Sequence, residues 1–264
     1  MRAMQTFCRT LPPVLLLALP AVLQAQFTYT TNNGTITITG YTGSGGAVTI
    51  PSTITGLPVT DIGSYAFEYS SLTSVTMGTN LIRIGDSAFY VCVSLSSVTI
   101  PDSVISIGYL AFYSDISLTS VTVGSRVTTL GNGAFEFCTS LTGAYFKGNA
   151  PSLGGPEVFS YDNSATVYYL PGTTGWGPTY GGRPTALWRP QVQTSRASFG
   201  LGTNQFGFNI KWVGGMTVVV EACTNLANPI WLAVSTNTLA GGSSYLSDPK
   251  WTNYPARFYR LRSL

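Results

Sequence analysis

The sequence contains ten carboxylates and four cysteines as candidate acid, base, nucleophile or metal-ligand side chains, and it contains no histidine. Without an imidazole, no Ser-His-Asp or Cys-His catalytic unit can be assembled. The carboxylates are scattered, but Glu68 and Glu136 each follow the Phe of an Ala-Phe pair. Two such carboxylates could hydrolyse a glycosidic bond if the fold held them roughly 5–9.5 Å apart. What they can do therefore depends on how the fold spaces them.

A repeat determines that spacing. A Gly-x-x-Ala-Phe cue occurs four times, with its phenylalanines 22 or 23 residues apart, and a weaker fifth copy follows. Self-similarity at this period is the signature of a solenoid, in which each repeat buries its apolar face against its neighbours. We expect the five phenylalanines to form an aromatic spine inside it: Phe67, Phe89, Phe112, Phe135 and Phe159.

A second element follows each cue and predicts a strand. In the ranges 71–77, 94–100 and 117–123 the apolar residues follow the pattern L-x-x-V-x-M/I/V among Ser and Thr. Stacked copies would form a parallel sheet with strands about 4.8 Å apart, joined by short helical or irregular return segments. The cue glycines are expected to allow a backbone turn that other residues resist; they are Gly63, Gly85, Gly108 and Gly131.

The same spacing argues against an enzyme. Glu68 and Glu136 lie three repeats apart, which corresponds to roughly 14 Å of stacking and is too far for a carboxylate pair. The sequence also has no EF-hand, P-loop, GxSxG or HExxH motif and no CxxC pair for zinc. We therefore predict no catalytic residues, no metal site and no cofactor.

The repeat resembles a known family. The pattern IG-x-x-AF-x-x-C-x-SL-x-x-V-x-IP, which residues 84–101 fit at every position, is similar to the BspA-type leucine-rich repeat of bacterial surface proteins. The resemblance covers about 48–170 and implies an exported solenoid that acts in adhesion or ligand recognition. Departures are local: Ser70 and Asp115 stand at the Cys position, and Gly78 and Gly124 stand at the Pro position.

Two cysteines share that repeat position. Cys92 and Cys138 are two repeats apart, which separates equivalent atoms by roughly 10 Å. A disulfide needs Cα atoms within about 7 Å. The sequence therefore predicts two free, buried thiols.

The first 25 residues are typical of a signal peptide. Arg2 and Arg9 precede the short apolar run LPPVLLLALPAVL, and a small-residue cleavage site ends at Ala25. The run is too short for a membrane span, and no other segment is long enough. We predict a secreted or cell-surface protein, with the periplasm as a further possibility. Residues 26–47 carry an Asn33-Gly34 hairpin signal and are predicted to cap the solenoid.

The predicted solenoid ends in a degenerate stretch. Across 48–190 the repeat weakens after residue 150, in a Gly/Pro-rich run that contains Trp176, Tyr180 and Trp188. Two interpretations remain open. The three rings plug the open end of the core, or they are exposed and form a platform on which sugar rings stack.

Residues 191–264 have lost the repeat. Short alternating runs separated by Gly, Pro, Asn and Asp predict a small β-sandwich, and the segment resembles C-terminal modules of exported proteins from Gram-negative bacteria. This part has six Lys/Arg against two Asp/Glu (net +4), whereas 26–190 has five against eight (net −3). A basic module could contact an anionic cell envelope, or its arginines could be ordinary solvated edge residues. Nucleic-acid binding is not expected.

The outward positions of the predicted sheet are the candidate binding site. One row offers hydroxyls and then two larger phenols, and its members are Thr76, Thr99, Thr122, Tyr145 and Tyr168. A second row consists of Thr73, Ser96, Thr119 and Thr142. The rows reflect β propensity and hydroxyl ladders, or they form a face that binds an extracellular protein or glycan. We predict an exported, non-enzymatic recognition or adhesion protein; a glycan-binding module and a structural envelope protein without a soluble ligand are the alternatives.

Overall fold

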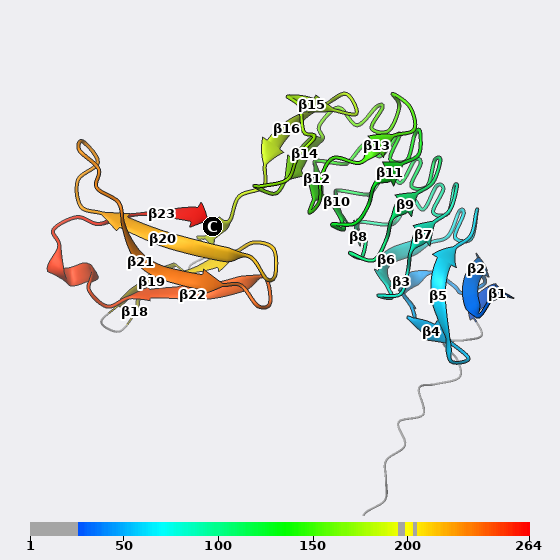
Figure 1. Cartoon of the computed structure of the whole chain (residues 1–264), viewed down its shortest axis with the longest axis horizontal. Coiled ribbons are helices and arrows are strands. Elements are labelled where there is room, and N and C mark those ends of the chain that lie inside the picture. Colours follow the sequence, from blue (N-terminus) through cyan, green and yellow to red (C-terminus); the bar gives the residue numbers. More distant parts are fainter. Residues whose placement is uncertain (1–25, 195–198, 203–204) are drawn as a thin grey trace, which may run out of the picture.

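The chain is described by a computed structural model that covers residues 26–194, 199–202 and 205–264. The predicted signal peptide, 1–25, lies outside the described residues. The ribbon first winds into a stack of turns and then forms two small sheets (Figure 1). None of the described helical segments is long and apolar enough to cross a membrane. The chain is mainly β and its repeats form a solenoid, as the sequence predicted.

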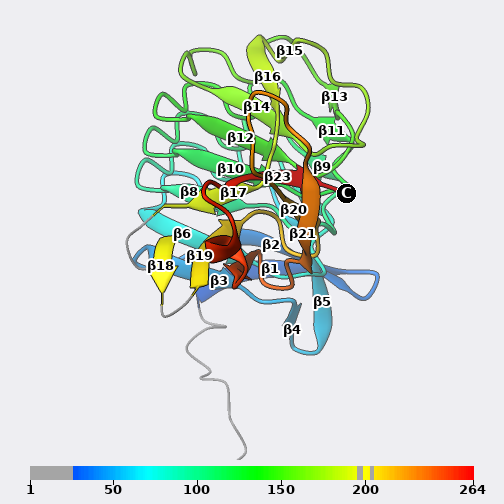
Figure 2. The ribbon, with the colours of Figure 1, turned by 90° about the vertical axis from the view of Figure 1, so that its left-hand side faces the viewer.

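One side of the solenoid is a sheet of eight strands, here called the first sheet, in the order β15-β16-β14-β12-β10-β8-β6-β3. All neighbours are parallel except β15 and β16, which are antiparallel. Its strands are seen one above the next in Figure 2. They are β3 (Gly46–Ile50), β6 (Leu72–Met77), β8 (Ser97–Thr99), β10 (Ser120–Val123), β12 (Gly143–Phe146), β14 (Thr166–Tyr169), β15 (Thr179–Tyr180) and β16 (Arg183–Leu187).

The second sheet forms the next side and has the order β1-β2-β5-β7-β9-β11-β13, with β4 paired to β5. The β1–β2 hairpin turns at Asn33 and Gly34, both with positive φ, and β2 then pairs in parallel with β5. The strands are β1 (Phe27–Asn32), β2 (Thr35–Tyr41), β4 (Thr53–Ile54), β5 (Leu57–Ile62), β7 (Arg83–Ile84), β9 (Ser106–Ile107), β11 (Thr129–Leu130) and β13 (Ser152–Leu153).

The third side consists of turns, and we call it the turn face (63–70, 85–92, 108–115, 131–138 and 154–162). Within a turn, the Tyr90 N–H donates to the Ser87 carbonyl three residues back (3.1 Å). Between turns, Phe89 N–H donates to Ala111 O and Val91 N–H to Tyr113 O, both at 2.8 Å. The return segments are therefore irregular rather than helical, and hydrogen bonds fix each to the next.

The cue glycines have a different role from the one predicted. Gly85, Gly108 and Gly131 do not adopt positive φ, so the expected reason for glycine, a turn that other residues resist, is wrong. A Cβ on Gly131 would lie 2.4 Å from the carbonyl carbon of Gly108. The positive φ falls instead two residues later, at Ser87 (53°) and Leu110 (51°). Glycine is needed because the backbones of adjacent repeats touch there.

The five cue phenylalanines form a continuous stack in the solenoid interior. All are 0% exposed. Adjacent rings from Phe67 to Phe159 have centroids 4.9, 5.0, 5.3 and 5.5 Å apart and planes within 9°. Tyr41 stacks on Phe67 at the first end (5.4 Å), and Gly181 lies against Phe159 at the other. Each ring is thus covered on both faces by neighbouring repeats or by the ends of the stack.

A polar column runs beside the spine, and only its cysteines were predicted. Cys92 and Cys138 are free and buried, which confirms that prediction. Asp115 and Asp162 occupy the same repeat position, and each is 0% exposed. Burial raises the pKa of Asp115 well above its ordinary value, and burial raises that of Asp162 to about 8 although Arg183 opposes it. The solenoid core therefore contains two carboxyls that favour the protonated state.

Beyond the solenoid, two small antiparallel sheets share a separate core around Phe208, Ile210, Val218 and Leu246. In one sheet β19 pairs with β17, β18 and β22, and in the other β20 lies between β21 and β23. A 3-10 turn spans Trp251–Asn253. The strands are β17 (Gln191–Gln193), β18 (Phe199–Gly202), β19 (Gln205–Lys211), β20 (Thr217–Cys223), β21 (Leu232–Thr238), β22 (Ser243–Asp248) and β23 (Phe258–Ser263).

Candidate functional site

The outward face of the first sheet brings the predicted site residues into one row. Thr99 pairs with Thr122, Thr122 with Tyr145, and Tyr145 with Tyr168 in successive parallel strands. Thr76 precedes them on β6, whose Val75 pairs with Val98 of β8. Thr76 and Thr99 are exposed, and the other three are half-buried. One ligand spanning the strands could therefore contact all five side chains.

The second row is different because its hydroxyls are already bonded. Thr119 Oγ1 donates to Ser96 O (3.0 Å), and Thr142 Oγ1 donates to Thr119 O (3.1 Å). Ser96 Oγ donates in the same way to Thr73 O (3.2 Å). Each of these carbonyls also accepts the backbone N–H of the same residue that supplies the hydroxyl. This row is a ladder that joins neighbouring repeats.

The first row has no such ladder. Within the described part of the chain, Thr76, Thr99 and Thr122 form no side-chain hydrogen bond. The bonded residues lie three positions before the free ones and just ahead of β8, β10 and β12, so the two rows occupy different positions in the repeat. The free hydroxyls can donate to or accept from a ligand without breaking a bond inside the protein.

The two phenols at the end of the row are held by ring contacts. Tyr145 and Tyr168 stack with centroids 4.9 Å apart and planes 10° apart. Trp188 lies against Tyr145 at 4.9 Å, tilted by 51°. Partial burial, and then the neighbouring Tyr168, raise the pKa of Tyr145, so its hydroxyl stays protonated at neutral pH. The row therefore ends in a rigid, half-exposed aromatic group.

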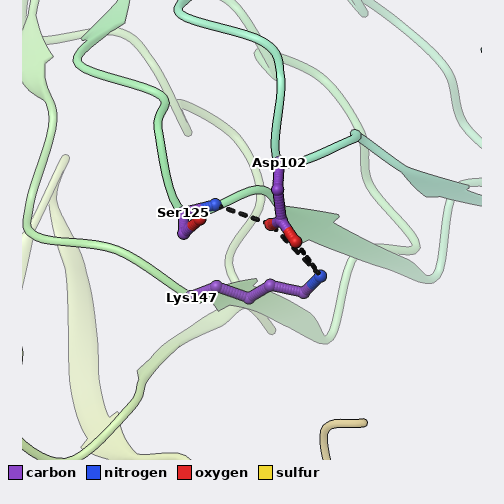
Figure 3. Close-up of polar contacts among 3 residues, drawn as sticks. All are labelled: Asp102, Ser125 and Lys147. Atoms are coloured by element: carbon purple, nitrogen blue, oxygen red, sulfur yellow. Dashed lines mark hydrogen bonds and ion pairs between the residues drawn. The ribbon is translucent and has the colours of Figure 1, made fainter. Parts of the chain in front are cut away.

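A groove of about 620 Å³ adjoins the other end of the row. Its lining includes Thr76, Thr99 and an ion pair between Asp102 and Lys147. Lys147 Nζ lies 3.2 Å from both Asp102 carboxylate oxygens, and the Ser125 N–H donates to Oδ1 at 2.9 Å (Figure 3). Partial burial raises the pKa of Asp102, but the Ser125 N–H and Lys147 outweigh it, so this pKa lies below its ordinary value.

Sequence reasoning missed this ion pair. Lys147 comes 45 residues after Asp102, one residue short of two full 23-residue periods. Lys147 directly follows β12, and Asp102 lies three residues after the end of β8, which could have signalled that they lie at the same edge of the first sheet. No periodic pattern indicated that the long lysine side chain would reach back over the intervening repeat.

Two of the three aromatic rings of the degenerate cap lie at the C-terminal end of the solenoid core. Tyr180 is 9% exposed, and its hydroxyl donates to Pro151 O (2.8 Å). Trp176 is half-buried against the solenoid core, stacked on Tyr169. These two rings plug the core, as one of the two interpretations predicted. Trp188 packs instead against the C-terminal core and Tyr145. Tyr180 is buried, and Trp176 and Trp188 are half-buried, which leaves little free ring surface for a sugar-stacking platform.

The remaining carboxylates do not assemble a metal site. The described residues contain no group of three or more Cys, Asp or Glu side chains positioned to hold an ion. Glu68 and Glu136 are half-buried on the turn face, in the first and fourth of its turns. Neither glutamate lies on the first sheet, where the predicted site residues stand.

Comparisons with known proteins identify the repeat family of the solenoid. Residues 60–174 match, in six copies, the family model described as BspA type leucine rich repeat region. The chain is similar to a leucine-rich repeat protein of T. pallidum, at 29% identity over 55% of this chain and 69% of that chain, with a TM-score of 0.52. It is also similar to one from Bacteroides capillosus, at 34% identity over 47% and 95% respectively, with a TM-score of 0.43. No curated protein matches it.

Proposed function

Because this chain belongs to the BspA-type leucine-rich repeat family through residues 60–174, we propose that it is an exported, non-enzymatic recognition or adhesion protein. The family itself points to protein interaction or adhesion. In our proposal the ligand is an extracellular protein or glycan. It lies across the first sheet and contacts Thr76, Thr99, Thr122, Tyr145 and Tyr168.

The observation that carries this proposal is the difference between the two hydroxyl rows. The hydroxyls of Thr119 and Thr142 donate hydrogen bonds to backbone carbonyls of the preceding repeat. Within the described residues, the side chains of Thr99 and Thr122 form no hydrogen bond, although their register across the strands is kept. A row of free hydroxyls on a rigid sheet offers evenly spaced polar contacts to an extended ligand.

The ends of the row supply the contacts that would fix the ligand. Tyr145 and Tyr168 offer a preordered aromatic surface of the kind that dominates binding energy in many interfaces. The groove at the other end offers the Asp102 carboxylate and the Lys147 ammonium, which neutralise each other. This end suits polar, uncharged groups, such as peptide amides or sugar hydroxyls.

The domain organisation is part of the same proposal. A signal peptide, 1–25, would direct export to the cell surface or medium. A capping hairpin, 26–47, and a solenoid, 48–190, would form the recognition unit, and a β-sandwich-like module, 191–264, would follow it. The paired strands of β1 and β2 support the first division, and the C-terminal core supports the last, with Leu170 and Trp188 of the solenoid range packed into it.

Arrays of glycans and extracellular matrix proteins test the proposal. We expect Thr99→Arg and Thr122→Arg to weaken binding of any captured ligand by tenfold or more, because each places a bulky cation in the row. Tyr168→Ala should weaken it as well. The matched control is Thr30→Arg, an equally polar change at an exposed position on β1, which should leave binding unchanged.

The outcomes separate the candidate functions. Capture of glycans alone would make the chain a glycan-binding module. Retention in the envelope fraction without capture of any soluble ligand would favour a structural envelope protein. Capture that persists in all three sheet variants would reject the first sheet as the binding surface.

A further inference from the structure

A second exposed surface lies on the turn face, and the first sheet does not use it. Five aromatic rings there form a chain along the solenoid, one from each successive turn. Neighbouring centroids are 5.8, 4.9, 5.4 and 4.0 Å apart. The rings belong to Tyr69, Tyr90, Tyr113, Phe137 and Tyr161.

The two end rings of this chain are exposed to solvent, and the three rings between them are partly so. Tyr69 is 66% exposed and Tyr161 is 58% exposed, while the three rings between them are half-buried. Tyr65 and Tyr109, 58% and 52% exposed, add two phenols on the same face. An aromatic surface of this extent is uncommon on a soluble protein and marks an interaction site.

The five turns themselves carry only negative charge, although Arg83 of β7, which pairs with Asp61 at 3.4 Å, lines the adjacent groove. The five turns contain no Lys or Arg. Glu68 and Glu136 are close enough to raise the pKa of Tyr90 and Tyr113, respectively, after the larger effect of burial. Asp86 and Glu157 are exposed beside them. None of these four carboxylates forms an ion pair within the described residues.

The backbone of this face is preordered. Hydrogen bonds join each turn to the next, such as Tyr69 N–H to Tyr90 O at 2.9 Å and Phe137 N–H to Ser160 O at 3.0 Å. A groove of about 680 Å³ follows the adjacent column of glycines, between the turn face and the second sheet. Asp86 and Tyr109 belong to both the groove and the turn face. A polypeptide backbone can approach closely where the floor is glycine.

We propose that the turn face binds an extended polypeptide segment rich in arginine or lysine. The unpaired carboxylates attract the cations, and the exposed tyrosines accept guanidinium or ammonium groups over their rings. The groove holds the backbone of the segment. The four intervals of about 4.8 Å between the five turns span about 19 Å, which matches roughly six residues of extended chain. This surface is independent of the first sheet, so the two proposals stand or fall separately.

Fluorescently labelled hexa-arginine, hexa-lysine and hexa-glutamate peptides test this proposal. We expect binding in the order arginine, lysine, glutamate, with the last undetectable, and weakening as salt is raised. The double variant Glu68→Gln/Glu136→Gln and the variant Tyr69→Ser should each weaken hexa-arginine binding by fivefold or more. Tyr29→Ser, at an exposed tyrosine of β1, is the matched control and should have no effect.

The variants must be shown to fold, and thermal unfolding followed by circular dichroism gives that check. Equal binding of hexa-glutamate, or unchanged affinity in both turn-face variants, would overturn the proposal. Binding of neutral oligosaccharides that Tyr69→Ser abolishes would assign the face to glycans instead. Sedimentation that shows self-association lost in Glu68→Gln/Glu136→Gln would assign it to a second copy of the chain. Thr99→Arg should leave hexa-arginine binding intact, whatever it does to the ligand of the first sheet.

Discussion

Asp115 Oδ1 accepts the backbone N–H of Cys92 at 2.7 Å, one repeat away, in the interior of the solenoid. The other carboxylate oxygen, Oδ2, has no hydrogen-bond partner in the described residues. The equivalent side chains of Cys92 and Cys138 donate their S–H to the carbonyls of Phe67 and Phe112. Burial without a neighbouring cation penalises the ionised carboxylate, so this position favours the protonated acid.

The first prediction is that Asp115→Asn stabilises the protein, increasingly so as pH rises. The pKa of Asp115 is raised in the folded state, so above about pH 4 the folded chain binds more protons than the unfolded chain. The free energy of unfolding therefore falls with rising pH, by at most about 1.4 kcal/mol per unit for each such carboxyl. For Asp162 this window closes near its folded pKa of about 8. Urea unfolding at pH 5, 7 and 9 measures the effect.

Asp102→Asn is the control of opposite sign. The pKa of Asp102 is lowered, so its stabilisation is present at neutral pH and is lost as pH falls below about 4. The variant should be slightly less stable than the parent at pH 7 and equal to it in acid. An Asp115→Asn variant whose advantage does not grow with pH would contradict the buried-acid interpretation.

A second prediction concerns the close contact between repeats. Gly131→Ala should destabilise the protein by about 3 kcal/mol or more, because its Cβ would meet the backbone of Gly108 at 2.4 Å. Gly241→Ala is the control, since a Cβ there meets nothing within 4 Å and its φ is not positive. Thermal and urea unfolding compare the two. Similar effects would show that repeat spacing is not limited by the glycine column.

Val91 gives a third prediction. This β-branched residue has a φ of 58°, a left-handed conformation that asparagine tolerates much better. Val91→Asn should therefore stabilise the protein by about 1 kcal/mol, even though a half-buried apolar side chain is lost. Chemical denaturation measures this. Val93→Asn, a nearby exposed valine without positive φ, should give no gain.

The two hydroxyl rows give a fourth prediction. Thr119→Val removes a donor to the Ser96 carbonyl and should cost about 0.5–1 kcal/mol of stability, while ligand binding is kept. Thr122→Val removes no internal bond and should leave stability unchanged while weakening binding. Unfolding and binding are measured on both variants. A loss of stability in Thr122→Val and a loss of binding in Thr119→Val would show that the first row supports the fold rather than the ligand.

The sequence predicted those features in which the same kind of residue recurs at the same position of each 23-residue repeat. Thr99, Thr122 and Tyr145 could be placed in a row because a strand alternates its faces and each repeat adds one strand. Whether that row binds a ligand stays a prediction. The free thiols of Cys92 and Cys138 followed from the same spacing.

The ring chain of the turn face and the buried carboxyls could not be predicted, because their residues break the period or depend on the backbone conformation. Tyr69 lies two residues after its spine Phe whereas Tyr90 lies one residue after its own, so no fixed position marked the ring chain. The positive φ of Tyr69 is one of the conformations that bring these rings together. The burial of Asp115 could not be predicted from its residue type, because aspartate is usually exposed to solvent.

The ion pair between Lys147 and Asp102 has a consequence for the addition of repeats to the solenoid by duplication. Repeat arrays lengthen by duplication of a unit, and a duplicated unit inserts one more strand into the stack. A copy inserted between β8 and β12 would move the ammonium about 4.8 Å further from the carboxylate and break the pair. A copy inserted ahead of β6 would leave it intact. A new repeat ahead of β6 would therefore lengthen the first sheet at one end while the ion pair and its groove are kept.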